Sequence, residues 1–346
     1  MTDILSMDHD ELGVFFGELG EPAYRAAQVF GWLHKKGAVS WQQMSDLPAR
    51  LRDRLEEEHP IGTVSVNRVQ VSAEDGTRKY LFELSDGELV ESVLMRYSFG
   101  NSVCVSSQAG CRMGCAFCAS TLKGLARNLT AGEILSQVYH VNGDLPDNER
   151  VSRVVVMGSG EPLDNYEGVI RFLRLLADDK GFNMSMRNMT VSTCGLIPGI
   201  DRLAGENLPI NLAISLHAPN DTIRKKIMPV ASKYAMDELI DACVRYYDAT
   251  GRRLTWEYAL IKGVNDSLSC ADELSDRIRG INSVVNLIAV NPVAERGLDS
   301  PDKKRVESFR KRLEARGVDV TVRRSLGRDI DGACGQLRNR ASDLHC

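Results

Sequence analysis

Short apolar runs alternate with longer amphipathic stretches from about residue 100 onward, and this alternation constrains the fold more than any other feature. The predicted strands are Val103–Ser106, Arg153–Met157, Asn188–Ser192, Ile210–Leu216, Arg253–Leu260, Val284–Val290 and Val318–Arg323. The predicted helices lie near residues 131–142, 166–179, 221–228, 236–249, 268–279 and 301–316. This succession is typical of a parallel sheet covered by helices. We therefore expect an α/β fold with a barrel or partial barrel.

The first hundred residues follow two other patterns. Between residues 8 and 58 apolar residues recur at helical spacing, and Gly20-Glu21-Pro22 separates two predicted helices. From about residue 62 the apolar period becomes two, with Asp75-Gly76 and Asp86-Gly87 as hairpin turns. We expect a helical accessory domain at 1–61, an antiparallel β extension at 62–98, a barrel core at 99–337 and a tail at 338–346.

Composition places the chain among ordinary globular proteins, with 43% hydrophobic and 26% charged residues. No apolar stretch reaches the roughly 18 residues of a membrane span, and the acidic N-terminal run lacks the pattern of a signal peptide. The nine cysteines are an odd number and thinly spread, unlike a secreted disulfide framework. We therefore expect a reducing, cytoplasmic location and no membrane partner.

Charge is distributed unevenly along the chain. Residues 1–60 carry 6 Lys or Arg against 11 Asp or Glu, whereas residues 301–346 carry 12 against 7. A basic segment of this kind suits a polyanion partner. A solvated helix face explains most such charge runs equally well, so the segment supports a polyanion partner only together with other signals.

Three cysteines form the most informative local motif, Cys111-Arg-Met-Gly-Cys115-Ala-Phe-Cys118. The CxxxCxxC spacing offers three thiolates to one metal centre and no obvious fourth. Iron–sulfur clusters are held by cysteine thiolates, and three ligands on a four-iron cluster leave one iron open to a small molecule. A structural zinc site is the alternative, but zinc sites are closed and four-coordinate, and no second CxxC or HxxxH follows. The spacing favours a cluster over zinc.

The other polar clusters follow predicted strands at their C-terminal ends. They are Gly158–Pro162, Ser192–Gly195, Ser215–His217 and Asn291-Pro292. Taken singly each is weak: Gly and Pro mark ordinary turns, Ser192 and Ser215 resemble capping residues, and a lone His217 is most often structural. Barrel enzymes build their sites at this edge of the sheet, so the shared placement predicts one active face.

Five stretches carry a further signal: Val90–Val93, Cys104–Cys111, Gly158–Leu163, Ile214–Pro219 and Asp329–Leu337. Together they resemble the RlmN/Cfr family of radical S-adenosylmethionine RNA adenosine methyltransferases, and the RlmN branch more than the Cfr branch. The resemblance runs from the N-terminal helices to about residue 340 and includes the aromatic Phe117 before the last cysteine of the loop. It implies a partial (β/α) barrel of the radical SAM type.

The resemblance implies two cofactors, one 4Fe–4S cluster and S-adenosylmethionine. Cys111, Cys115 and Cys118 are implied to ligate three irons, with the amino and carboxylate groups of S-adenosylmethionine on the fourth. The implied S-adenosylmethionine pocket consists of Gly160, Glu161, Ser192, Ser215, Leu216, His217 and Asn291.

The implied chemistry consumes two S-adenosylmethionine molecules per turnover. One methylates Cys334; the other is cleaved by an electron from the cluster, and the resulting 5′-deoxyadenosyl radical takes a hydrogen from methyl-Cys334. The carbon radical then adds to C2 of adenine. Glu91 is implied as the proton acceptor, and Cys104 as the thiol that releases the product by a transient disulfide with Cys334.

The implied partners are 23S rRNA, tRNA and a reducing electron donor such as flavodoxin or ferredoxin. The helical domain at 1–61 is implied to take part in RNA recognition, and Arg112, Lys123 and Arg127 are candidates for phosphate contacts. A splayed adenosine is expected, because a stacked base would not reach a barrel mouth.

Three alternatives remain open from the sequence. Cfr-type methylation at C8 of the same rRNA adenosine shares every motif named above. A glycyl-radical activase shares the cysteine loop but should lack the Cys104 and Cys334 pair. A non-catalytic zinc or iron–sulfur RNA-binding module would not need the clusters at the strand ends.

Overall fold

The computed structural model describes residues 3–62, 64–290, 297–324, 326–327 and 329–330. Within these residues, ten strands form one sheet in the order β1-β2-β3-β4-β7-β8-β9-β10-β11-β12, and β5 and β6 form a separate hairpin. The strands are β1 (Ser65–Val71), β2 (Arg78–Glu83), β3 (Leu89–Tyr97), β4 (Gly100–Val105), β5 (Gln108–Gly110), β6 (Leu125–Asn128), β7 (Val151–Val156), β8 (Met189–Thr193), β9 (Asn211–Ser215), β10 (Leu254–Leu260), β11 (Ser283–Ala289) and β12 (Val320–Val322).

The sheet changes direction at β4. Strands β1 to β4 pair antiparallel, whereas β4, β7, β8, β9, β10, β11 and β12 pair parallel in that order. The turns at Gly76 and Gly87 have φ of 72° and 84°, a conformation that glycine adopts at little cost, so both predicted hairpins are present. The antiparallel strands thus continue the barrel sheet, and the predicted α/β partial barrel is confirmed.

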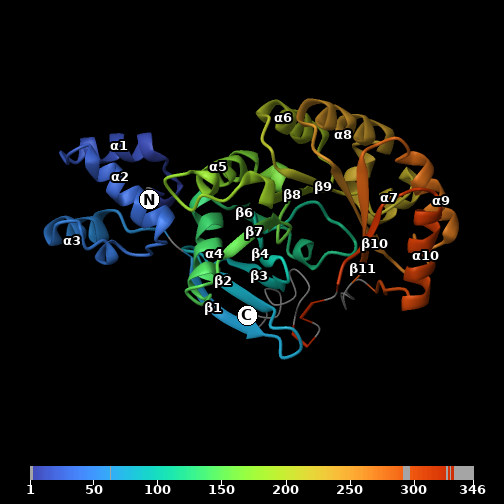
Figure 1. Ribbon diagram of the computed structural model, residues 1–346, viewed down its shortest axis with the longest axis horizontal. Helices are drawn as coiled ribbons and strands as arrows, with labels where there is room; N and C mark the ends of the chain where they lie inside the picture. Colours follow the sequence, from blue (N-terminus) through green and yellow to red (C-terminus); the bar gives the residue numbers. More distant parts are fainter. Residues whose placement is uncertain (1–2, 63, 291–296, 325, 328, 331–346) are drawn as a thin grey trace.

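Helices run along the outside of this curved sheet (Figure 1). They are α4 (Ala131–Gly143), α5 (Tyr166–Ala177), α6 (Ile197–Glu206), α7 (Asp221–Ile227), α8 (Met236–Thr250), α9 (Leu268–Arg277) and α10 (Lys303–Ala315). Local sequence explains their ends: Thr130 and Glu133 form a capping box at the start of α4, and Gly251 ends α8 with φ 63°. Trp256 and Tyr258 of β10 are fully buried between strands and helices and anchor the core.

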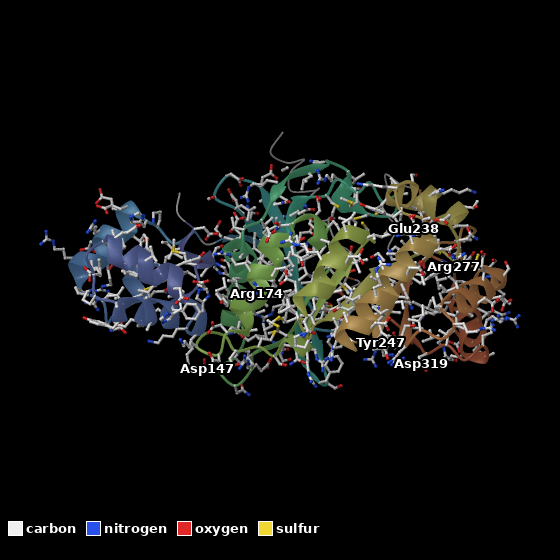
Figure 2. The ribbon with its side chains drawn as sticks, turned by 90° about the horizontal axis from the view of Figure 1, so that it is seen from above. Asp147, Arg174, Glu238, Tyr247, Arg277 and Asp319 are labelled. Carbon is white, nitrogen blue, oxygen red and sulfur yellow. The ribbon has the colours of Figure 1, made fainter. Side chains whose placement is uncertain are left out.

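The N-terminal segment is helical, with α1 (His9–Glu18), α2 (Tyr24–Phe30) and α3 (Ala49–Glu58). It lies at one end of an elongated molecule, and the last helices lie at the other (Figure 2). Phe16 and Trp41 pack edge to face, with ring centroids 6.4 Å apart, and both are fully buried. His34 contacts the hydroxyl of Tyr139 on α4 through Nδ1 at 2.9 Å, which joins this segment to the barrel.

Three elements were not predicted from the sequence: strands β5 and β6 and helix α6. The β5–β6 hairpin is only three and four residues long, too short for a periodic signal. Helix α6 contains Pro198, Gly199 and Gly205, which have low helix propensity. It forms because proline is tolerated in the first turn and because α6 packs on α8, with Arg245 bonded to both carboxylate oxygens of Asp201.

Among the residues that the structure describes, no helix is long and apolar enough to span a bilayer.

Candidate active site

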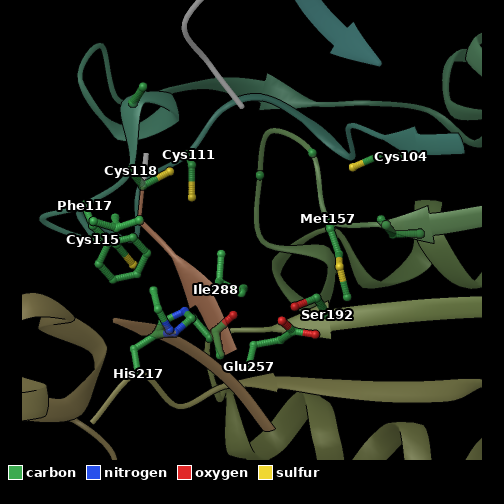
Figure 3. Close-up of a pocket in the computed structure, with 18 of the residues that line it drawn as sticks. Cys104, Cys111, Cys115, Phe117, Cys118, Met157, Ser192, His217, Glu257 and Ile288 are labelled. Atoms are coloured by element: carbon green, nitrogen blue, oxygen red, sulfur yellow. The ribbon is translucent and has the colours of Figure 1, made fainter. Parts of the chain in front are cut away.

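A cavity of about 320 Å³ lies at the C-terminal ends of the parallel strands. The loop of Cys111, Cys115 and Cys118 forms one side, and Cys104 with Met157 lies on the opposite side (Figure 3). The predicted convergence on one face is therefore observed for the strand ends that the structure describes.

The cysteine loop is held by backbone contacts. The N–H of Cys111 donates to the carbonyl of Gly124 at 2.9 Å, and the N–H of Ala116 donates to the carbonyl of Ile227 at 2.8 Å. The Thr121 hydroxyl donates to the carbonyl of Cys118 at 2.9 Å. The Phe117 side chain packs edge to face on His217, with centroids 4.7 Å apart. These contacts fix the loop, with all three cysteines lining the cavity.

The donor set fits an iron–sulfur cluster better than a single ion. In the described part of the chain, no three His, Cys, Asp or Glu side chains converge on a point where one metal ion would sit. Three thiols spread along one cavity wall suit a group with several irons, each taking one cysteine. Burial raises the pKa of the Cys111 thiol to about 12, so its thiolate form needs a neighbouring metal.

Two glycines let the loop after β7 approach the loop after β4. A Cβ on Gly158 would lie 2.7 Å from the carbonyl oxygen of Val105, and one on Gly160 would lie 2.6 Å from Cβ of Gln108. Gly160 also has φ of 108°, which other residues rarely adopt. Any larger residue would push the loop away from the cavity wall.

The carboxylate of Glu161 ties two strand ends together. Its Oε2 accepts from the N–H of Cys194 at 2.7 Å, and its Oε1 accepts from the N–H of Leu163 at 3.1 Å. Burial raises its pKa, while these two backbone donors stabilise its charged form and act in the opposite direction. Glu161 therefore shapes the cavity by positioning the backbone between β7 and β8.

The remaining predicted cofactor residues fall into three groups. Ser192, Ser215 and His217 line the cavity. Leu216 does not, since its side chain is fully buried in the core and its N–H donates to the carbonyl of Glu257 at 3.1 Å. Asn291 lies outside the described residues.

His217 is held in one tautomer. The N–H of Ala259 donates to Nδ1 at 2.9 Å, which leaves the ring proton on Nε2. Burial, helped by the nearby Arg224 guanidinium, lowers the pKa of His217 to about 3, so the ring is neutral at physiological pH.

The predicted catalytic residues lie on adjacent strands. Val93 of β3 pairs with Cys104 of β4, and both line the cavity. Glu91 precedes Val93 by two residues, so its side chain lies on the same side of the sheet. It is buried and is not among the residues that line the cavity, and Nζ of Lys79 lies 3.1 Å from its Oε2. Cys334 lies outside the described residues.

Sequence reasoning missed two residues of the cavity wall. Cys194 lies within the predicted Ser192–Gly195 cluster but has no predicted role of its own; it lines the cavity, and its backbone N–H donates to Glu161. Glu257 of β10 also lines it, 5% exposed, and accepts a hydrogen bond from Asn286 at 2.9 Å. Burial raises its pKa. A carboxylate inside an otherwise apolar strand was the signal available in the sequence.

Several predicted phosphate-binding cations already have carboxylate partners. Arg112 pairs with Asp164, and Arg127 pairs with Asp86 and Glu133. In the basic segment, Arg312 of α10 pairs with Asp272 of α9 at 2.7 Å, and Arg316 pairs with Asp272 and Asp276. The arginines at the end of α10 thus serve largely to dock it on α9.

Comparisons with known proteins agree with this geometry. Residues 2–61 match the ribosomal RNA large subunit methyltransferase N-terminal domain, and residues 105–268 match the radical SAM superfamily. The fold is similar to the crystal structure of a radical SAM methyltransferase from Sphaerobacter thermophilus, with a TM-score of 0.94 and 43% identity over 97% of this chain and 99% of that one. Fold and site therefore define a radical SAM methyltransferase.

Curated relatives narrow the class. The chain is 53% identical to a probable dual-specificity RNA methyltransferase RlmN from Lachnospira eligens, over 98% of this chain and 97% of that protein. It is 50% identical to one from Symbiobacterium thermophilum, over 98% and 92%. The protein belongs to the RlmN family of radical SAM RNA methyltransferases, which use S-adenosylmethionine and a 4Fe–4S cluster. The alternatives of a glycyl-radical activase and a non-catalytic module are thereby overturned.

Proposed function

We propose that this protein methylates C2 of an adenosine in the peptidyl-transferase region of 23S rRNA and of the adenosine 3′ of the anticodon in tRNAs. The curated relatives are named as dual-specificity RNA methyltransferases. One structural observation carries the proposal: Cys104 lines the same cavity as the three-cysteine loop. A second thiol near the radical source is what a methyl-cysteine route to an aromatic carbon needs.

In this proposal Cys111, Cys115 and Cys118 hold the cluster, and Gly160, Glu161, Ser192, Ser215, His217 and Asn291 form the S-adenosylmethionine pocket. Leu216 is left out, because its side chain is buried in the core. When bound, cluster and S-adenosylmethionine supply a methyl group and a hydrogen-abstracting radical. Neutral His217 offers an Nε2–H donor to a ligand in the cavity. The Glu161 carboxylate contributes through the backbone that it fixes.

The remaining roles concern the RNA. Cys334 carries the methyl carbon, Glu91 accepts the proton that the ring carbon loses, and Cys104 releases the product by a disulfide with Cys334. Two S-adenosylmethionine molecules are used per turnover. A flavodoxin or ferredoxin supplies the electron, in a reducing cytoplasm where these thiols survive.

Analysis of modified nucleosides tests the product. RNA from a strain lacking the gene, and from the same strain carrying it, is digested and separated by liquid chromatography with mass spectrometry. We expect 2-methyladenosine in 23S rRNA and tRNA only when the gene is present. Finding 8-methyladenosine with unmodified C2 would instead assign the Cfr-type reaction and leave the cysteine roles intact.

A further inference from the structure

Lys79 and Glu91 form an ion pair inside the protein. Their side chains are 0% and 4% exposed, and Nζ of Lys79 lies 3.1 Å from Oε2 of Glu91. Ion pairs on the surface of this molecule are far more exposed to solvent: the side chains of Arg171 and Glu11, for example, are 46% and 39% exposed.

Stability alone does not explain a buried pair. Removing two charges from water costs several kcal/mol per ion, and well-packed apolar residues of similar volume are often as stable or more stable. The neighbours of this pair on the same strands, Leu81 and Val93, are apolar and buried. An apolar pair would therefore suit this position, which points to a functional reason for the charges.

Strand register places the pair beside the reactive thiol. Lys79 of β2 pairs with Val93 of β3, and Val93 pairs with Cys104 of β4, so the three side chains share one side of the sheet. The β2–β3 register has no irregularity from Leu89 to Leu94, which keeps Glu91 on that side too. Glu91 and Cys104 are diagonal neighbours, with Cβ atoms about 7 Å apart by strand geometry.

Other contacts fix the position of Glu91. The Ser106 hydroxyl donates to its backbone carbonyl at 2.7 Å. The titratable groups that adjacent strands place on its side are Lys79 and Glu83 from β2 and the Cys104 thiol from β4. Arg323 and Arg324 line the same cavity from the segment after β12.

We propose that Lys79 is a positioning residue that holds the buried Glu91 carboxylate beside Cys104, oriented to accept the substrate proton. This inference rests on the proposed function, which gives Glu91 that role. In the step concerned, the C–H bond at the methylated ring carbon breaks, its proton goes to the Glu91 carboxylate, and its electron pair stays on the ring. The unpaired electron of the adduct would pass to the oxidised iron–sulfur cluster, which restores the aromatic ring. Lys79 transfers no proton in this step.

Loss of Lys79 should affect one step only, the resolution of the RNA adduct. Without the ammonium, the Glu91 carboxylate loses the side chain that holds it in position beside Cys104. The base is then misplaced when the RNA adduct needs it. Formation of the covalent adduct between Cys334 and RNA does not need this base, whereas its resolution does.

The test follows the enzyme–RNA adduct in Lys79→Met under single-turnover conditions, with reconstituted enzyme and an RNA fragment. We expect adduct formation at the wild-type rate and resolution slowed about tenfold or more at neutral pH, equivalent to about 1.4 kcal/mol or more. Lys79→Arg should restore resolution. Arg78→Met is the matched control, since Arg78 is the neighbouring cation on the other side of β2.

Each outcome has a defined meaning. Resolution at the wild-type rate in Lys79→Met, or equal slowing of formation and resolution, overturns the inference. If Lys79→Met does not fold, Lys79→Gln serves in its place. The double variant Lys79→Met/Glu91→Gln separates stability from chemistry, because it removes both members of the ion pair and should unfold near the wild-type temperature. If Glu91→Gln alone resolves the adduct normally, the role of Glu91 in the proposed function fails, independently of Lys79.

Discussion

The N–H of Ala259 donates a hydrogen bond to Nδ1 of His217 at 2.9 Å, which joins the end of β9 to the next strand, β10. His217 has φ of 54°, in the left-handed region, which non-glycine residues adopt uncommonly and mainly as Asn, Asp or His. The bond therefore fixes a residue of uncommon backbone conformation whose ring lines the cavity, with its Nε2–H as a donor.

Substituting His217 should separate its structural role, as the acceptor for the N–H of Ala259, from its role as a donor in the cavity. His217→Asn tolerates the backbone conformation and offers a side-chain oxygen to Ala259, so we expect a folded protein with S-adenosylmethionine affinity reduced about tenfold. His217→Phe leaves the Ala259 N–H without its acceptor and should cost about 1–3 kcal/mol of stability. Thermal unfolding and equilibrium dialysis measure the two effects. A phenylalanine variant as stable as the wild type would contradict this account.

Glu161→Gln should weaken the junction between β7 and β8. The carboxylate accepts from two backbone N–H groups, and an amide would set its own NH₂ against one of them. We expect a loss of about 1–3 kcal/mol and weaker S-adenosylmethionine binding. Glu167→Gln is the control, because that side chain is 79% exposed and pairs only with a surface arginine, Arg202, in the described contacts. Equal melting temperatures for both variants would disprove the structural role of Glu161.

Replacing any cysteine of the loop should remove the cluster. Cys111→Ala, Cys115→Ala and Cys118→Ala each leave too few thiolates, so we expect loss of iron, sulfide and 5′-deoxyadenosine formation. Cys243→Ala is the control, since Cys243 is fully buried in α8 and is not among the residues that line the cavity. Metal analysis after anaerobic purification is the measurement. Normal iron loading in one of the three loop variants would refute the ligand assignment.

Variants that lack one of the two reactive thiols should have distinguishable defects. Cys334→Ala is expected to keep the cluster but to carry no methyl group, whereas Cys104→Ala should accumulate a covalent enzyme–RNA species because its release step lacks the second thiol. Intact-mass analysis detects both states. Normal product formation by Cys104→Ala, without any adduct, would rule out the resolving role.

Acid should loosen the contact between the N-terminal helices and the barrel. Burial lowers the pKa of His34 to about 4, against an ordinary value near 6.5. Between pH 6.5 and pH 4 the unfolded chain therefore binds a proton at His34 that the folded chain does not. The contribution of neutral, buried His34 to the free energy of unfolding, about 3 kcal/mol, is complete above pH 6.5 and is lost as pH falls toward 4. Urea unfolding at a series of pH values measures it. His34→Asn, which retains a polar group near Tyr139, should flatten the dependence, and an unchanged slope would exclude His34 as its source.

The sequence by itself determined the parallel part of the fold and the face that carries the site. Parallel strands end at one edge, so clusters after successive strands had to meet, and Cys111, Glu161 and His217 do line one cavity. The hairpins at Gly76 and Gly87 followed from turn chemistry, which is local.

Only the tertiary structure decided which side chains pair across strands and helices. The contact of Lys79 with Glu91 depends on strand register, and the pairing of Arg312 with Asp272 depends on how α10 docks on α9. Neither leaves a periodic signal in the sequence, because the partners belong to elements that fold together only in the complete sheet. Helix α6 was missed for a related reason, since packing on α8 overrides its weak local propensity.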